Sequence, residues 1–376
     1  MFLAIRELLF AKGRFVLMGS VVALISILMV LLSGLSVGLV NDGVSGLQKM
    51  PVTSFAFQED VSKDSAFSRS VIDKDVVETW AAQPGVDEAA PFGNALVNAE
   101  SEKGVEIDLA LFGIETDSYL APEVESGSVL GDDPNEIVIS ATAAEEGIEV
   151  GDVIKVEPMG AELTVAGVMP DQHTFGHVDI AYLPLRTWQE IRTGAAPGEE
   201  VPARVYDEIT AVAVQGSDDA DALKAGDAAA GTTSMTLDDS FGASPGYTAE
   251  TSTLQLIQVF LYAISALVVG AFFTVLTIQR KQEVAVMRAM GASTAYLLRD
   301  SLLQSLLLLL GSVAVGVGLG LAAGAAISGT AMPFALEAGP IAVATTLLIV
   351  LGVLGAAVAV VRITRVDPLT ALGGNR

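Results

Sequence analysis

The sequence predicts an integral membrane protein with four transmembrane α-helices and an inserted α+β extracellular domain. Three observations predict this fold class: long uncharged runs, a sharp separation of basic from acidic segments, and one central stretch with strand and turn patterns. The chain has 376 residues, 51% of them hydrophobic, yet its formal net charge is −25. An apolar and an acidic composition can coexist only if they belong to different parts of the chain.

The uncharged runs give the membrane part. Each of them exceeds the roughly 20 residues that a helix needs to cross a bilayer. A cleavable signal peptide is the competing interpretation of the N-terminus. The first run is too long for the apolar region of such a peptide, which favours an uncleaved anchor. We therefore predict transmembrane helices over residues 15–40, 253–279, 302–329 and 339–361.

The distribution of charge predicts the orientation. Three short segments, 1–14, 280–300 and 362–376, contain ten of the 20 Lys and Arg residues but only four of the 45 Asp and Glu residues. Basic segments next to transmembrane helices remain in the cytoplasm. We therefore expect a protein of the cell membrane with both termini in the cytoplasm and the large acidic domain outside.

The remaining segments follow from these two patterns. Residues 1–14 are patterned as an amphipathic helix on the inner membrane surface, in contact with lipid, although a basic flank that only fixes topology would have the same charges. The predicted layout adds an extracellular domain with its stalk over 41–252, a cytoplasmic loop over 280–301, an outer loop over 330–338 and a cytoplasmic C-terminal segment over 362–376.

The order of strand and helix patterns in the extracellular domain predicts a globular α+β fold with small sheets. Its chain contains no cysteine, so its stability must come from its own core. Residues 216–251 are rich in Gly, Ser, Ala and Thr and are expected to be a linker. Alternation of apolar residues predicts strands over 52–58, 108–115, 136–140, 152–158 and 163–170. A helix is expected over 70–83, and the segment 141–154 is expected to form a helix closed by Gly147, followed by a turn at Gly151 and Asp152.

Small residues mark one face of the first transmembrane helix. Gly34 and Gly38 have the GxxxG spacing that lets two backbones approach closely. Their partner could lie within the same subunit or in a second copy of the chain.

Several function classes are excluded by missing motifs. The sequence has no G-x-x-x-x-G-K-[ST] phosphate-binding loop, no G-x-S-x-G and no H-E-x-x-H. The predicted helices hold no ionisable residues that could form an ion pathway. The sequence has no strongly basic patch with interleaved aromatic residues, so we expect no nucleic-acid partner. We therefore expect a protein that is not an enzyme, and any ATP-driven work must come from another subunit.

The cytoplasmic loop carries more than charge. At helical spacing, Val284, Met287 and Arg288 share one face. A loop that only set the topology would need the basic residues but not this apolar face. We expect the loop to dock on a cytoplasmic partner.

The chain resembles the MacB/FtsX-type permeases of ABC transporters. The segments that carry the resemblance are QRKQEVAVMRAMGAS (279–293), RVDPLTAL (365–372) and EIVISATAAEEGIEVGDVIKV (136–156). The resemblance implies a homodimer that works with two copies of an ABC ATPase subunit, which alone would bind ATP and Mg²⁺. It also implies a coupling role for Glu283, Met287, Arg288 and Gly291.

A closer resemblance, to the haem efflux permeases of Gram-positive bacteria, implies the cargo. It rests on SGLSVGL (33–39), FAFQED (55–60), GYTAETSTL (246–254) and residues 264–293. Such a permease would take haem from the outer leaflet and expel it, with no intrinsic cofactor. The alternatives are an FtsX-like signalling module that regulates an extracellular protein, and an exporter of a lipoprotein, peptide or drug.

A haem permease needs an axial ligand for ferric iron near a cleft that is open to lipid. Glu250 and Tyr247 stand just before the helix predicted over 253–279, and their oxygens suit ferric iron. Glu250 could equally be an acid that favours the start of that helix. Glu59 is a second candidate if residues 41–58 form a stalk, and Met29 could supply a thioether sulfur.

The two histidines of the chain, His173 and His177, are four residues apart. On a helix this spacing would allow both to bind a metal, but Pro170 and Gly176 indicate a loop. We expect surface histidines.

Overall fold

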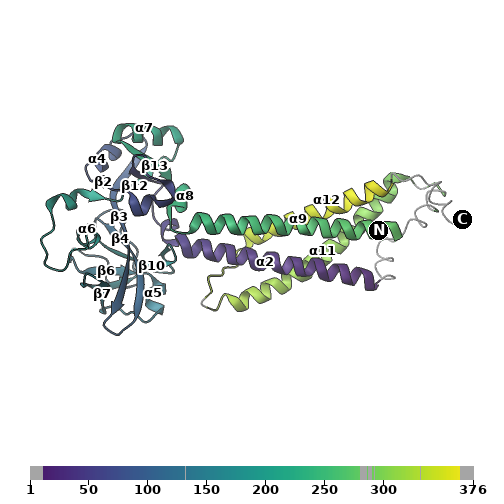
Figure 1. The fold of residues 1–376 in the computed structure, drawn as a ribbon, viewed down its shortest axis with the longest axis horizontal. Helices are drawn as coiled ribbons and strands as arrows, with labels where there is room; N and C mark the ends of the chain where they lie inside the picture. Colours follow the sequence, from purple (N-terminus) through teal and green to yellow (C-terminus); the bar gives the residue numbers. More distant parts are fainter. Residues whose placement is uncertain are drawn as a thin grey trace. The chain divides into compact units, whose positions relative to one another are not determined.

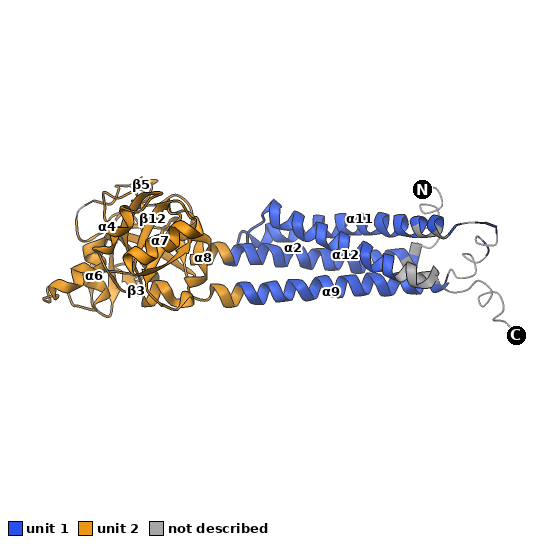
Figure 2. Ribbon diagram, turned by 90° about the horizontal axis from the view of Figure 1, so that it is seen from above, with its two compact units in different colours: residues 1–39, 251–376 blue, residues 40–250 orange. Residues whose placement is uncertain are grey.

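The computed structural model describes residues 12–131, 133–279, 286, 290–291, 293–330 and 332–364. The chain divides into two compact units, shown in blue and orange in Figure 2. We call residues 1–39 and 251–376 the helix unit, and residues 40–250 the outer unit.

The helix unit is built on four long helices, as the sequence predicts (Figure 1). Each contains a segment that is long and apolar enough to span a membrane. The last residues of the first helix and the first residues of the second belong to the outer unit. The helices are α2 (Lys12–Gln48), α9 (Tyr247–Gln279), α11 (Thr294–Ile327) and α12 (Ala338–Thr364).

Glycines allow close approach between these helices. A Cβ atom built on Gly316 of α11 would lie 2.4 Å from the carbonyl oxygen of Ala23 on α2, and one on Gly355 of α12 would lie 2.6 Å from that of Ala266 on α9. Because glycine has no side chain, the helix backbones can come into direct contact. Such contacts matter in lipid, where no hydrophobic effect drives helices together.

The glycine pair of α2 packs within the subunit, against a loop and not a helix. A Cβ atom on Gly34 would lie 2.3 Å from the ring of Phe334, and one on Gly38 would lie 2.2 Å from the carbonyl oxygen of Pro333. The backbone N–H of Ala335 also donates a hydrogen bond to the carbonyl of Gly34. The GxxxG spacing therefore seats the segment between α11 and α12.

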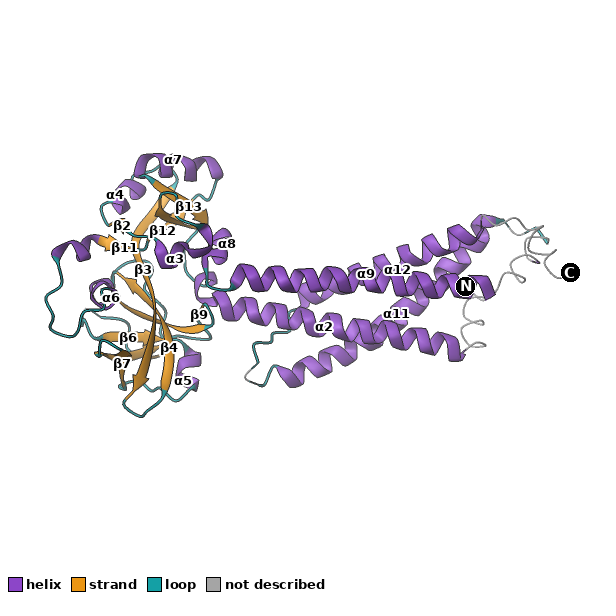
Figure 3. Ribbon diagram, viewed as in Figure 1, coloured by secondary structure: helices purple, strands orange, loops and turns teal. Residues whose placement is uncertain are grey.

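The outer unit contains one large sheet of eleven strands, so the expectation of small sheets is wrong (Figure 3). The strand order is β13-β1-β12-β3-β4-β10-β6-β8-β5, with β7 paired to β3 and β8, and β9 paired to β10. The strands are β1 (Ser54–Gln58), β3 (Val86–Ser101), β4 (Glu106–Ile114), β5 (Ser126–Gly127), β6 (Glu136–Ile139), β7 (Val153–Glu157), β8 (Ala161–Val168), β9 (Thr174–Phe175), β10 (Val178–Pro184), β12 (Ala211–Gly216) and β13 (Thr232–Thr236).

Two further expectations for this unit need correction. The helix predicted over 70–83 is instead β2 (Ile72–Asp73), which pairs with β11 (Glu208–Ile209), followed by the short α4 (Val76–Ala81). The segment 216–251 is not a linker, because it folds as α7 (Ala220–Ala230), β13, α8 (Leu237–Ser240) and η3 (Phe241–Ala243) before α9 begins. The other helical elements are η1 (Lys63–Ser65), α3 (Ala66–Arg69), α5 (Ala141–Glu145), α6 (Leu185–Arg192) and η2 (Ala203–Asp207).

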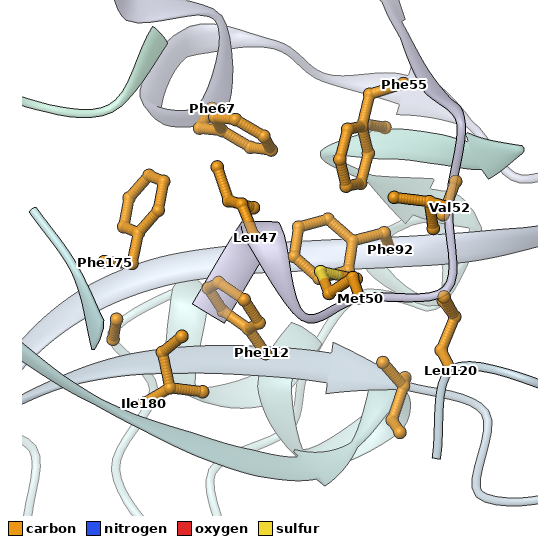
Figure 4. Close-up of a cluster of buried hydrophobic side chains, with 14 of the residues drawn as sticks. Leu47, Met50, Val52, Phe55, Phe67, Phe92, Phe112, Leu120, Phe175 and Ile180 are labelled. Carbon is orange, nitrogen blue, oxygen red and sulfur yellow. The ribbon is translucent and has the colours of Figure 1, made fainter. Parts of the chain in front are cut away.

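Aromatic rings fill the core on one face of the sheet (Figure 4). The ring of Phe112 lies edge-on to those of Phe92 and Phe175, with centroid distances of 4.9 and 5.8 Å. Leu47, in the last turn of α2, is fully buried in the same cluster. The end of α2 is therefore anchored in the core of the outer unit.

Candidate functional site

A tight hairpin presents His177 at the candidate site. Strands β9 and β10 pair through Phe175 and Val178, which leaves Gly176 and His177 as a two-residue turn. Their φ angles are 61° and 66°, and positive values at both central positions are typical of a type I′ turn. A left-handed backbone costs a residue other than glycine about 1–2 kcal/mol. The contacts of His177 must therefore hold it there.

The hairpin is fastened to the end of α2. Ser45 and Thr174 are hydrogen-bonded through their hydroxyls at 2.8 Å, and the backbone N–H of Thr174 donates to Ser45 Oγ at 3.0 Å. The N–H of Gly176 donates to the carbonyl of Gly43, which also accepts from Ser244 Oγ. These bonds join α2, the hairpin and the segment before α9.

His177 lies between two carboxylates. Its Nδ1 is 2.8 Å from Oδ2 of Asp42 on α2, and its Nε2 is 3.1 Å from Oε2 of Glu250 on α9. The amide of Gln172 donates to the other oxygen of Asp42 at 3.0 Å. All of these residues belong to the outer unit, so the three elements meet within one compact body.

The two contacts of the imidazole differ in quality. Nδ1 faces an acceptor-only carboxylate and therefore donates its proton to Asp42. Nε2 is buried and close to Glu250, but it is not aligned for a hydrogen bond. The contact with Glu250 is thus within ion-pair distance, and Nε2 can donate to this carboxylate only when the ring carries a proton on both nitrogens.

The start of α9 leaves room for the Glu250 carboxylate. Gly246 precedes the helix with a φ of 81°, and a Cβ atom there would lie 3.1 Å from Glu250 Oε1. Tyr247 packs against the ring of Phe241 at 6.2 Å between centroids. The Glu250 side chain is 38% exposed, so a ligand can reach it.

Two titratable groups beside the hairpin are shifted by burial. Burial, and next the charge of Lys49, lower the pKa of His173 below its ordinary value. Burial raises the pKa of Asp179 on β10, against the opposing effect of the hydroxyls of Thr142 and Ser140. Both groups therefore favour their neutral forms more than they would in water.

The predicted binding residues do not all meet. Glu250 and Tyr247 lie together in the first turn of α9. Glu59 is in an exposed turn after β1, and none of the contacts between described residues joins it to Glu250. Met29 belongs to the helix unit, where it is 3% exposed and packs in the apolar cluster of the helices.

Of the four predicted coupling residues, Gly291 belongs to the part of the chain that the structure describes. Glu283, Met287 and Arg288 lie outside the described residues. Gly291 is exposed, and its φ of 97° is one that a residue with a side chain rarely adopts.

The sequence did not identify Asp42 or His177. His177 was expected at the surface, whereas the structure holds it between two carboxylates. The signal that could have found it is Gly-His between apolar strand residues, since a two-residue turn fixes the direction of both side chains. Among the described residues, no group of three or more His, Cys, Asp or Glu is arranged to hold a metal ion.

Comparison with known families decides the class. The MacB-like periplasmic core domain matches residues 16–232, and the FtsX-like permease C-terminal domain matches residues 256–368. The chain belongs to the MacB/FtsX-type family of ABC transporter permeases. This confirms the family predicted from the sequence motifs, with an outer domain inserted between the first and second of four membrane helices.

Individual relatives are distant but cover the full length of this permease. A Staphylococcus haemolyticus protein, HrtB, is 24% identical over 372 residues, which are 99% of each chain, and its name assigns it to a hemin transport system. An uncharacterized ABC transporter permease of Mycobacterium tuberculosis is 23% identical over 390 residues, covering 100% of this chain and 99% of the relative. The periplasmic region of MacB from Actinobacillus actinomycetemcomitans is 15% identical, with a TM-score of 0.36, over 50% of this chain and 91% of that one.

Proposed function

We propose that this permease is the membrane subunit of an efflux pump that takes haem from the outer leaflet of the membrane and expels it. The observation that carries the proposal is the Glu250 carboxylate, which is held at the first turn of α9 with one oxygen facing His177 and the other without a described partner. The name of the staphylococcal relative supports the same cargo.

The chemistry of the site suits ferric haem. A carboxylate oxygen is a hard ligand for ferric iron, and a single axial bond can be exchanged, which a transporter needs to release its cargo. We assign Glu250 as the axial ligand, with Tyr247 beside it in the same turn. Glu59 of the outer unit and Met29 of the helix unit are proposed as further haem contacts.

Energy would come from a partner. The sequence has no phosphate-binding loop, so ATP must be hydrolysed by another subunit. From the resemblance to the MacB/FtsX-type permeases, we propose a homodimer of this chain with two ABC ATPase subunits. Residues Glu283, Met287, Arg288 and Gly291 would transmit the ATPase motion from the cytoplasmic loop. In this arrangement both termini and the loop face the cytoplasm, and the helices contact lipid.

Hemin titration of the detergent-purified protein, followed by the Soret band, tests the cargo and its ligand. The wild type should give a saturable shift, and Glu250→Ala together with Glu59→Ala should weaken binding at least about tenfold, because the loss of one charged ligand is worth about 1.5–3 kcal/mol. A wild type without a saturable shift, or a double variant with unchanged binding, contradicts the assignment.

A second arm separates coupling from binding. Met287→Asp should abolish stimulation of the partner ATPase, because a charge replaces the apolar side chain that docks on it, while hemin binding is retained. Loss of both properties would indicate misfolding and would leave the coupling role without support.

A further inference from the structure

We propose that His177 is the positioning residue for Glu250: held by Asp42 through Nδ1, it fixes Oε2 of the glutamate and leaves Oε1 to bind the iron of haem. The inference rests on the proposed function, because it concerns the ligand of the same cargo. It adds Asp42 and His177, which the sequence did not identify, to the predicted ligand Glu250.

The first step is the orientation of the imidazole. Asp42 Oδ2 accepts from Nδ1 at 2.8 Å, while Gln172 holds Oδ1 at 3.0 Å, so neither the ring nor its carboxylate can turn freely. Histidines that bind metals directly are oriented in the same way, by a carboxylate on the second nitrogen. Here the oriented nitrogen, Nε2, faces a carboxylate that can itself bind the metal.

The second step is the rigidity of the support. The two-residue turn leaves His177 no freedom along the hairpin, and the hydrogen bonds from Thr174 and Gly176 fix the hairpin to the end of α2. That end is anchored by Leu47, which is fully buried in the aromatic core. Nε2 therefore occupies a point that is defined by the sheet and not by a mobile loop.

The third step concerns Glu250. A glutamate at the start of a helix has three rotatable side-chain bonds, and ordering them opposes ligand binding. Contact of Oε2 with Nε2 at 3.1 Å restricts this freedom in advance, while no described contact occupies Oε1. A carboxylate can keep one hydrogen bond on one oxygen while the other binds a metal.

The contact between Nε2 and Glu250 can improve when a ligand binds. Nε2 is buried without a hydrogen bond, which is an unfavourable state for a polar atom. With a proton on both ring nitrogens, a small rotation of the Glu250 carboxylate would let Nε2 donate to Oε2. A ligand on Oε1 that selects this rotation would thus be favoured by the histidine, as hydrogen bonds at functional sites often tighten only in the complex.

Titration of the full-length protein with ferric hemin tests the proposal, with optical and electron paramagnetic resonance spectra as readouts. His177→Ala should weaken hemin binding about tenfold and give mixed iron coordination, because Glu250 is no longer held. His177→Gln should restore most of the affinity, because its amide can donate to the carboxylate. Asp42→Asn should act in the same direction with a smaller loss, and Glu250→Gln should abolish the carboxylate-bound spectrum.

The matched control is His173→Gln, which changes the other histidine of the same segment and should leave the affinity and spectrum unchanged. If His177→Ala binds hemin with the wild-type affinity and spectrum while Glu250→Gln does not, the positioning role is wrong and the proposed function stands. A wild type without any saturable hemin spectrum overturns the proposed function.

A readout without haem separates these failures. The chain has two histidines, so imidazole NMR signals of histidine-labelled protein can be assigned with His173→Gln alone. Glu250→Gln should shift the His177 signal, whereas Glu100→Gln, an exposed carboxylate of β3, should not. An unshifted His177 signal in Glu250→Gln overturns the contact itself, whatever the cargo.

Discussion

The outer unit and the helix unit of this permease differ in how each packs its own interior. The outer unit fills its interior with large rings, and Phe55, Phe92 and Phe112 are fully buried in one cluster. The helix unit has glycine at its closest helix contacts, where Gly316 and Gly355 lie against the backbones of neighbouring helices. In water, the burial of apolar surface drives packing, whereas in lipid close backbone contact must replace it. Loss of volume should therefore damage the first unit, and added volume the second.

Phe112→Ala should have the largest effect. The ring touches Phe92, Phe175 and Tyr182, and its removal leaves a cavity that the sheet cannot close. We expect a loss of about 3–5 kcal/mol in the stability of the outer unit. Hydrogen exchange of outer-unit peptides in the full-length protein measures it, with Leu96→Ala, on the exposed face of β3, as the control. Equal protection in both variants would contradict the role of the aromatic core.

Gly316→Val should destabilise the helix unit by adding volume at a helix contact. Its Cβ atom would overlap the backbone of Ala23, 2.4 Å from the carbonyl oxygen, so α2 and α11 must separate. Overpacking of this kind costs about 1–3 kcal/mol. Gly318→Val on the same helix is the matched control, because nothing lies within 4 Å of its Cβ position. The thermal stability of the purified protein should fall for the first variant only, and equal stabilities would refute glycine-mediated packing.

The smallest expected effect is the contribution of His173 to pH dependence. Because burial lowers its pKa in the folded protein, the unfolded chain takes up the proton first as the pH falls through about 6.5. The outer unit should therefore lose stability on acidification, and His173→Gln should lose less. Unfolding temperatures of both proteins between pH 8 and 5 measure the difference. Parallel curves would show that this histidine is as free to ionise as in water.

The membrane architecture was predictable because the requirement is compositional. An uncharged run of sufficient length is a property of contiguous residues, and the four helices follow from it. Strand β3 was missed for the opposite reason. Its sequence contains Pro91 and Gly93, which weaken a strand pattern, and Gly93 is needed because a Cβ atom there would lie 2.3 Å from the distant Trp188. Such a requirement is visible only in the folded sheet.

The candidate site divides in the same way. Glu250 and Tyr247 are neighbours on one helical turn, so sequence spacing could bring them together. Asp42 and His177 are 135 residues apart, and their contact depends on how the hairpin packs on α2. The expectation of surface histidines was reasonable for a loop but could not include a partner that the fold supplies.

The sheet order has a consequence for biosynthesis. Strand β1 pairs with β12 and β13, so it has no strand partner until the chain has been made as far as β12, and its second edge stays open until Thr236. During this interval β1 exposes Phe55 and Phe57 on an open edge, which is a hazard for aggregation. Soon after Thr236 the chain enters α9, which begins at Tyr247. The outer unit can therefore close its sheet only when nearly all of it has been translocated, and a chain stopped before β12 should be a target for proteolytic quality control.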